Sequence, residues 1–147
     1  MATSAPGVAM GEPVVPAGAT RVGIDVVEIA EVEQALAAHR EGYLRRVFTA
    51  GERADSGTDP RRLAARFAAK EALVKALGEP DGATPPRDVE VVLTDGVPGL
   101  AVHGILGMRL HRAGLVVVAV SLTHADCHAA AVVLLGPAHG AGETAAG

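Results

Sequence analysis

Apolar residues recur with two different periods in the first part of the chain. From Arg21 to Val27 they alternate between two faces, which predicts a β-strand. One face of this strand carries Val22, Ile24 and Val26, and the other carries Gly23, Asp25 and Val27. The next apolar residues recur at the spacing of an amphipathic helix, and they are Ile29, Val32 and Leu36. The pattern therefore predicts a strand followed by a helix.

The second part of the chain returns to strands. Segments 89–93 and 99–102 flank the turn Asp95-Gly96 and predict an antiparallel hairpin. Leu115 to Leu122 is an unbroken run rich in β-branched residues, which favours a buried central strand. Segment 128–135 follows after a short turn and predicts the last strand.

Two short helices lie between these elements. Thr49 and Glu52 have the spacing of a capping box, which opens a helix reaching about Ala54. A helix over 104–112 would place Ile105 and Met108 on one face. The order of the elements favours an α+β fold, in which a mainly antiparallel sheet packs against a long central helix.

That long helix occupies the middle of the chain. Asp59 is a favourable N-cap, Pro60 suits the first helical position, and Gly78 suits the residue after the end. The apolar face of the helix carries Leu63, Phe67, Val74 and Leu77. Lys70 lies in the middle of this face, where a solvated lysine is not expected.

The lysines of this helix have two interpretations. Lys70 and Lys75 are the only lysines in the chain, against eleven arginines. In the first interpretation, Lys75 forms a surface pair with Glu71, and Lys70 extends along the apolar stripe to reach water. In the second, both serve a functional site, because lysine binds phosphate as a compact, rotatable cation. The helix alone does not decide between them.

Asp25, near the end of the first strand, also has two interpretations. Asp25 and Glu28 have a spacing like that of a capping box, so Asp25 could be the N-cap of the following helix. Alternatively, its carboxylate is a ligand for a hard cation such as Mg²⁺, and the small residue Gly23 keeps its surroundings open.

Composition excludes several classes of function. The chain has 147 residues, a formal net charge of −4 and 2% aromatic residues, which argues against nucleic-acid binding. Cys127 is the only cysteine, so neither an internal disulfide nor a cysteine-based zinc site is expected. The longest apolar run is too short to span a membrane, and no secretory signal is evident. We therefore expect a cytoplasmic protein.

The two ends of the chain differ in composition from the rest. Residues 1–20 are rich in Ala, Gly, Pro and Val without a period, so we expect a disordered leader in which Met10 could be the true start. Residues 137–147 have a similar composition and are expected to form a flexible tail. Residues 21–136 would then form a single domain.

Several motifs together resemble the 4′-phosphopantetheinyl transferases, specifically the short holo-acyl-carrier-protein synthase group. They are Val22-Gly23-Ile24-Asp25 in the first strand, Arg66-Phe67-Ala68-Ala69-Lys70-Glu71 with Lys75 in the central helix, Ser121-Leu122-Thr123-His124 near the end, and Val47-Phe48-Thr49 followed by Glu52. The resemblance covers most of the chain. It favours the functional interpretation of both Asp25 and the lysines.

This resemblance implies an activity and a site. The activity is transfer of the 4′-phosphopantetheine arm of coenzyme A to a serine of an apo acyl carrier protein, giving holo-carrier and 3′,5′-ADP. Asp25 and Glu71 would hold the Mg²⁺ that the reaction requires. The sequence does not identify the base that receives the serine proton, and Glu71 acting through a metal-bound water is the first candidate. Lys75 would act on the phosphates, and Lys70 would support the site. Arg66 and His124 would lie near the nucleotide end of coenzyme A.

The resemblance also implies partners. Short members of the group are homotrimers with active sites between subunits, and their first helix faces an acidic carrier protein. Relatives usually carry an arginine where this chain has Glu31, and an acid there would repel the usual carrier surface. We therefore expect either a fatty-acid carrier docked toward Arg40, Arg45 and Arg46, or a less acidic carrier of a specialised pathway.

Two other functions are compatible with the sequence. A non-catalytic relative would keep the fold and bind coenzyme A without transfer. A Mg²⁺-dependent hydrolase would cleave a pyrophosphate with water as the acceptor. The presence of Asp25, Glu71 and Lys75 argues against the non-catalytic relative, and the mass of the carrier after incubation would separate all three functions.

Overall fold

The computed structural model describes residues 19–138, and its elements follow the predicted order. They are β1 (Arg21–Glu28), α1 (Ile29–Val47), α2 (Ala50–Ser56), α3 (Pro60–Leu77), the short 3₁₀ helix η1 (Pro86–Asp88), β2 (Val89–Thr94), β3 (Val97–Val102), α4 (Gly104–Arg112), β4 (Leu115–His124) and β5 (His128–Pro137). Nearly all of the expected leader and tail lies outside the described residues. Among the described helices, none combines the length and apolar character that a membrane crossing requires.

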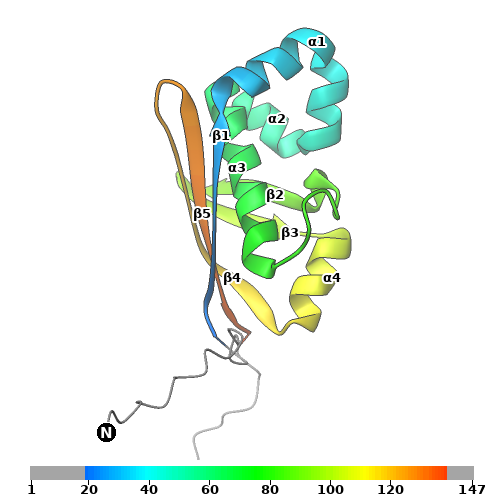
Figure 1. Cartoon of the computed structure of the whole chain (residues 1–147), viewed down its shortest axis with the longest axis vertical. Helices are drawn as coiled ribbons and strands as arrows, with labels where there is room; N and C mark the ends of the chain where they lie inside the picture. Colours follow the sequence, from blue (N-terminus) through cyan, green and yellow to red (C-terminus); the bar gives the residue numbers. More distant parts are fainter. Residues whose placement is uncertain (1–18, 139–147) are drawn as a thin grey trace, which may run out of the picture.

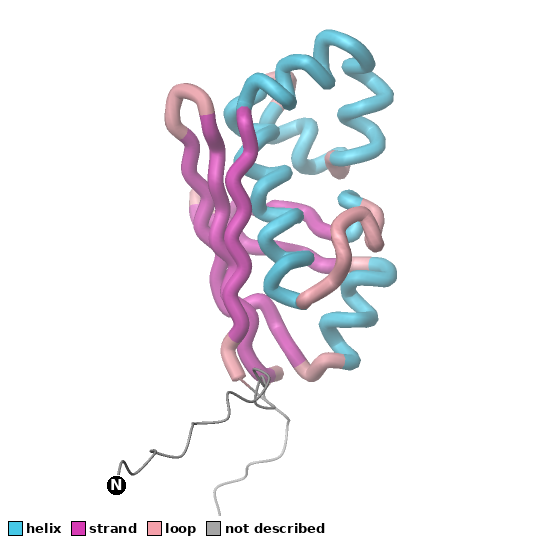
Figure 2. Tube along the Cα trace, in the orientation of Figure 1, coloured by secondary structure: helices cyan, strands magenta, loops and turns pink. Residues whose placement is uncertain are grey.

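Two antiparallel sheets organise the molecule. β1, β5 and β4 form a three-stranded sheet in that order, and β2 and β3 form a separate hairpin. Figure 1 shows α3 lying along one face of the three-stranded sheet, with α1 and α2 at one end of the molecule. The hairpin, the loop after α3 and α4 follow on the helical side (Figure 2). The predicted α+β architecture with a long central helix is confirmed.

The order of strands in the larger sheet corrects one prediction. β5 pairs with β1 on one side and with β4 on the other, so β5 is the central strand and β4 lies at an edge. The apolar run of β4 had favoured the opposite arrangement. Several of its side chains, including Val116 and Val118, are exposed in this single chain. The unbroken apolar run therefore belongs to an edge strand, and the outer face of this strand is exposed in the single subunit.

The outer face of the same sheet is apolar across β1 as well. Val22, Ile24 and Val26 are 66%, 58% and 59% exposed, because they point away from α3. Gly23 and Val27 point toward α3 and are buried. The two faces of β1 were predicted correctly, and the face with the larger apolar residues is the one that remains exposed.

The central helix begins and ends where its local signals predicted. The Asp59 carboxylate accepts a hydrogen bond from the backbone N–H of Arg61 at 3.0 Å, and Gly78 adopts a left-handed conformation with φ of 77°. Most of α3 is buried, including six alanines whose small side chains allow neighbouring elements to approach closely. This helix is therefore the centre of the core.

The face of α4 that carries Ile105 and Met108 is not the one that packs on the core. Ile105 and Met108, which share a face, are 49% and 54% exposed. The buried residues of this helix are Leu106 and Leu110. Leu106 and Leu110 are four positions apart, so they share the face of α4 that packs inward.

Candidate active site

Asp25 reaches the central helix because β1 lies directly against the backbone of α3. A Cβ atom added at Gly23 would be 1.9 Å from the carbonyl oxygen of Ala72, so only glycine permits this approach. Asp25 is two residues farther along β1 and points to the same face of the sheet. The glycine and the aspartate of the first motif are thus linked by geometry: the first allows the contact that positions the second.

The Asp25 carboxylate accepts a hydrogen bond from the Lys75 ammonium, with 2.6 Å between Oδ1 and Nζ. This contact overturns two of the alternatives. The N-cap of α1 is Glu28, which makes no side-chain capping bond, so Asp25 is not a helix cap. Lys75 is paired with Asp25 on the neighbouring strand, whereas a surface pair with Glu71 had been the simpler expectation.

Glu71 lies one turn before Lys75 on the same helix and completes a group of interacting charges. Its partial burial raises the pKa of the Glu71 carboxyl, and the negative charges of Asp25 and Asp81 raise it further. The positive charge of Lys75 acts in the opposite direction. The hydrogen bond to Asp25 is the main cause of the raised pKa of Lys75. The fold therefore brings together Asp25, Glu71 and Lys75, as the motifs predicted.

Two carboxylates in this arrangement suit a divalent cation. Mg²⁺ is usually held by one or two protein carboxylates, with water and substrate phosphates filling its remaining positions. After burial, the negative charge of Asp25 is the next cause of the raised pKa of Glu71, and a cation between the two carboxylates would relieve this repulsion. Within residues 19–138 no group of three or more His, Cys, Asp or Glu side chains is arranged to hold a metal on its own. The donor set therefore fits a metal completed by a phosphate-bearing ligand.

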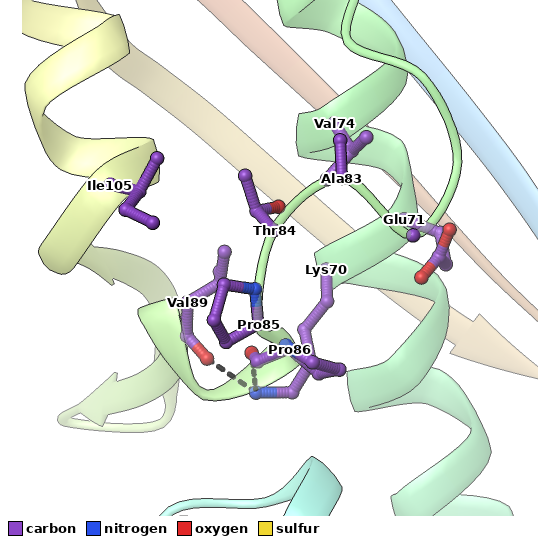
Figure 3. Close-up of a pocket in the computed structure, with 10 residues that line it drawn as sticks. Lys70, Glu71, Val74, Ala83, Thr84, Pro85, Pro86, Val89 and Ile105 are labelled. Carbon is purple, nitrogen blue, oxygen red and sulfur yellow. Dashed lines mark hydrogen bonds between the residues drawn. The ribbon is translucent and has the colours of Figure 1, made fainter.

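A cavity of about 530 Å³ opens beside Glu71. Its walls come from α3, the proline-rich loop after α3, the start of β2 and Ile105 of α4 (Figure 3). The lining is mostly apolar, and Glu71 contributes a carboxylate to it. Sequence reasoning did not predict this loop as part of the site. The stiff segment Thr84-Pro85-Pro86 was its only signal, because consecutive prolines make a preformed wall.

Lys70 lines the same cavity, but its ammonium points away from Glu71 (Figure 3). The residue is 1% exposed, so it does not extend along the apolar stripe into water. Its ammonium lies 2.6 Å from Glu52 Oε1 and donates to the carbonyl oxygens of Pro86, at 3.1 Å, and Val89. Burial lowers the pKa of Lys70, and the Glu52 carboxylate opposes that shift. Lys70 therefore supports the cavity wall from within the core.

Glu52 is the partner that sequence reasoning missed. It had been assigned to a capping box, and the structure confirms both reciprocal bonds of that box with Thr49. The same carboxylate is fully buried, binds Lys70 and accepts the backbone N–H of Val91 at 3.2 Å. Along the chain, Glu52 lies between the apolar residue Phe48 and the buried helix α3. This place in the sequence was the available signal that Glu52 is buried. Glu52 joins α2, α3 and β2 at one point.

Arg66 and His124 also come together, at a second cavity of about 380 Å³. Arg62 and Thr123 lie on its wall as well. Arg66 is buried, and its Nε has no hydrogen-bond partner among the described residues. Burial is the main cause of the lowered pKa of Arg66. A buried guanidinium with a free N–H, next to a histidine and a hydroxyl, suits an anionic group.

The two cavities share no lining residue. Asp25, Glu71 and Lys75 belong to the side where α3 meets β1 and its own following loop. Arg66 and His124 belong to the side where α3 meets β4 and the β2–β3 hairpin. The structure therefore groups the predicted site residues into two sets on one subunit.

Comparison with known proteins relates this arrangement to one enzyme family. The family model described as "4'-phosphopantetheinyl transferase superfamily" matches residues 21–126. A holo-[acyl-carrier-protein] synthase of Anaeromyxobacter sp. (strain K) is 45% identical over 122 residues, which cover 78% of this chain and 94% of that protein. A second such synthase, from Frankia casuarinae, is 44% identical over 114 residues, covering 77% and 93% of the two chains.

Solved structures agree with the sequence comparison. An ACPS–CoA complex from Chronobacterium ammoniagenes superposes with a TM-score of 0.71 at 28% identity, covering 81% of this chain and 98% of that one. The acyl carrier protein synthase of Mycobacterium tuberculosis gives a TM-score of 0.63 at 38% identity, covering 80% and 96%. The residues matched by the family model include all four motifs named above. The chain belongs to the 4′-phosphopantetheinyl transferase superfamily.

Proposed function

We propose that this protein is a magnesium-dependent holo-acyl-carrier-protein synthase whose site is built around Asp25, Glu71 and Lys75. The enzyme transfers the 4′-phosphopantetheine group of coenzyme A to a serine of an apo acyl carrier protein. The observation that carries the proposal is the pair of carboxylates beside a lysine and an apolar cavity, in a chain 45% identical to a holo-[acyl-carrier-protein] synthase. This combination suits a ligand with an uncharged arm and a pyrophosphate.

The reaction is a substitution at phosphorus. The serine oxygen forms a bond to the β-phosphorus of coenzyme A, the bond from that phosphorus to the bridging oxygen breaks, and 3′,5′-ADP leaves. Asp25 and Glu71 would hold Mg²⁺, which when bound supplies neutralising charge for the pyrophosphate. Lys75 would bind the phosphate oxygens with its exposed ammonium. Glu71 is our first candidate for accepting the serine proton, since its carboxylate lines the cavity at which the serine would arrive.

Arg66 and His124 would bind the nucleotide end of the same substrate. Because they line a separate cavity on one subunit, a single chain does not present both ends of the site together. A homotrimer in which one subunit contributes Glu71 and its neighbour contributes Arg66 would do so. The exposed apolar face of the three-stranded sheet supports such an assembly.

The cell would use this activity in the cytoplasm, where coenzyme A and carrier proteins meet. The acceptor would be the carrier of fatty-acid biosynthesis or of a specialised pathway. Neither membrane nor nucleic acid is needed as a partner for this chemistry.

One experiment separates the transferase from its two alternatives. The protein is incubated with apo carrier protein, coenzyme A and Mg²⁺, and the intact mass of the carrier is measured. A gain of one phosphopantetheine supports the transferase. Loss of coenzyme A without a gain on the carrier would support a hydrolase, and binding of coenzyme A without either change would support a non-catalytic module. Full transfer after thorough chelation of divalent cations would overturn the magnesium requirement.

A further inference from the structure

The contact between Lys75 and Asp25 joins groups of very different mobility. The Asp25 side chain is 14% exposed and is held by β1 against α3, whereas the Lys75 side chain is 48% exposed. The ammonium is carried on a flexible four-carbon stem, so it can leave Asp25 without any movement of the helix. The carboxylate, by contrast, cannot follow it, because Gly23 fixes β1 on the backbone of α3.

The charges around this contact are unbalanced. Three carboxylates, those of Asp25, Glu71 and Asp81, act on Lys75, and Lys75 is the cation that acts on Glu71. A single ammonium therefore neutralises a site with an excess of negative charge. A divalent cation bound by Asp25 and Glu71 would supply the same neutralisation and would repel the ammonium at short range.

We infer that Lys75 is a built-in counter-ion of Asp25, which a divalent cation displaces, so that metal binding releases the ammonium toward the phosphates of the substrate. This inference rests on the proposed function and adds a switch to it. The ammonium and the metal compete for one carboxylate. The released ammonium then faces the solvent side of the site, where an anionic ligand would arrive.

Thermodynamic linkage between the two contacts of Asp25, with Lys75 and with the metal, determines the consequences of this competition. If metal binding weakens the contact between Lys75 and Asp25, then that contact must weaken metal binding by the same factor. Removing the ammonium therefore tightens metal binding in the absence of nucleotide. The same removal weakens binding of coenzyme A, because the phosphates lose a cation. The two affinities move in opposite directions, which a merely structural lysine would not produce.

The composition of the chain allows a direct test. The chain has only two lysines, so labelling lysine with ¹³C at Cε gives two NMR signals, which the Lys75→Arg variant assigns. Titrating the full-length protein with Mg²⁺ alone should shift and sharpen the Lys75 signal. Lys70 is the internal control, because its ammonium is buried and bound to Glu52.

A binding measurement completes the test. Calorimetry with Mn²⁺ alone should show binding about five- to tenfold tighter for Lys75→Met than for the wild-type protein, within the usual range of coupling between sites. Lys75→Arg keeps the charge and should bind Mn²⁺ within about twofold of the wild type. Arg61→Met removes an exposed cation near the start of the same helix and should leave Mn²⁺ affinity unchanged.

Each outcome decides the inference. Metal binding with release of Lys75 and tighter binding by Lys75→Met supports it. Metal binding with an unchanged Lys75 signal overturns the displacement while leaving the metal site intact. If the wild-type protein binds Mn²⁺ no better than the Asp25→Asn variant, both the displacement and the metal site are overturned. The transfer of phosphopantetheine is judged separately by the mass of the carrier, so failure of the switch and failure of the function are distinguishable.

Discussion

At the scale of single residues, the site places negative charge where the fold disfavours it. Glu71 is partly buried and lies near two other carboxylates, Asp25 and Asp81. Burial and these neighbours raise the pKa of Glu71, which means that its ionised form is less stable in the folded chain than in the unfolded chain. Function and stability therefore make opposite demands on this residue.

Replacement of Glu71 by glutamine should raise stability while abolishing transfer. A carboxyl with a raised pKa favours folding below its ordinary value of 4.5 and loses that contribution as the pH rises through the folded value. In chelator-treated buffer at pH 7, Glu71→Gln should therefore melt about 2 °C above the wild type, and the difference should shrink toward pH 4.5. Glu33→Gln, at an exposed position of α1, should show no such trend. A lower melting temperature for Glu71→Gln at pH 7 would contradict the argument.

Lys70 should behave as a structural residue of the cavity wall. Lys70→Met leaves the fully buried Glu52 carboxylate without its ammonium, which should cost about 3–5 kcal/mol in the free energy of unfolding. The double variant Lys70→Met/Glu52→Gln should recover part of this loss, because it removes the unpaired buried charge and its amide oxygen can still accept one backbone N–H, such as that of Val91. Urea unfolding measures both, with Arg61→Met as the surface control. Equal stability of Lys70→Met and wild type would show that the pair contributes nothing.

The residues also show what could be predicted from sequence. Lys70 was recognised as misplaced, because helical periodicity puts it among apolar side chains. Its partner could not be found in the same way, since Glu52 lies eighteen positions earlier on another helix. Periodicity identifies which side chains share a face of one element. It carries no information on which elements meet.

At the scale of elements, β1 lies directly against the backbone of α3 at Gly23. The short distance between Gly23 and the backbone of Ala72 leaves no room for a side chain. This close contact determines where Asp25 lies relative to Glu71 and Lys75. A motif of glycine followed two residues later by aspartate thus has a physical basis. The motif could be read from the sequence, but the reason for its glycine required the structure.

Gly23→Ala should damage the site more than the fold. The added Cβ would lie 1.9 Å from the Ala72 oxygen, so β1 must move away from α3, at a cost of about 1–3 kcal/mol. Asp25 moves with it, and transfer should fall by more than tenfold under conditions in which the variant remains folded. Gly42→Ala is the matched control, because nothing lies within 4 Å of the added atom. Circular dichroism and carrier mass measure the two effects, and wild-type transfer by Gly23→Ala would refute the proposed role of the approach.

The first helix should decide which carrier is accepted. Its early turns expose Glu31 and Glu33, whereas the basic residues Arg40, Arg45 and Arg46 come later. If this helix faces the carrier, Glu31→Arg should raise kcat/KM for an ordinary acidic carrier, and more so at low salt, since screening acts beyond about 10 Å at 0.1 M. Glu41→Arg makes the same charge change after the irregular residue His39 and should have a smaller effect. An unchanged kcat/KM for Glu31→Arg at every salt concentration would show that docking occurs elsewhere.

At the scale of the whole molecule, the unusual feature is the uncovered apolar face of the three-stranded sheet. Val22, Ile24 and Val26 of β1 share this exposed character with Val116 and Val118 of β4. Exposed apolar patches of this kind mark surfaces that bind other proteins. The residues of β4 have the composition of a buried strand. Burial by another subunit would leave the same signature as burial within one, so the sequence alone could not separate the two.

We predict that the protein is a homotrimer joined through this face. Light scattering should give three times the chain mass of 14.8 kDa at micromolar concentration. Ile24→Lys places a charge in the centre of the face and should yield a folded monomer, because Ile24 contributes little to the core of its own subunit. Transfer should fall when assembly is lost, since in the proposed trimer Arg66 and His124 would reach the substrate bound at Glu71 only across a subunit boundary. Ala38→Lys, on the exposed side of α1, should leave the mass of the assembly unchanged. A fully active monomer would show that one subunit contains the whole site and that the apolar face serves another partner.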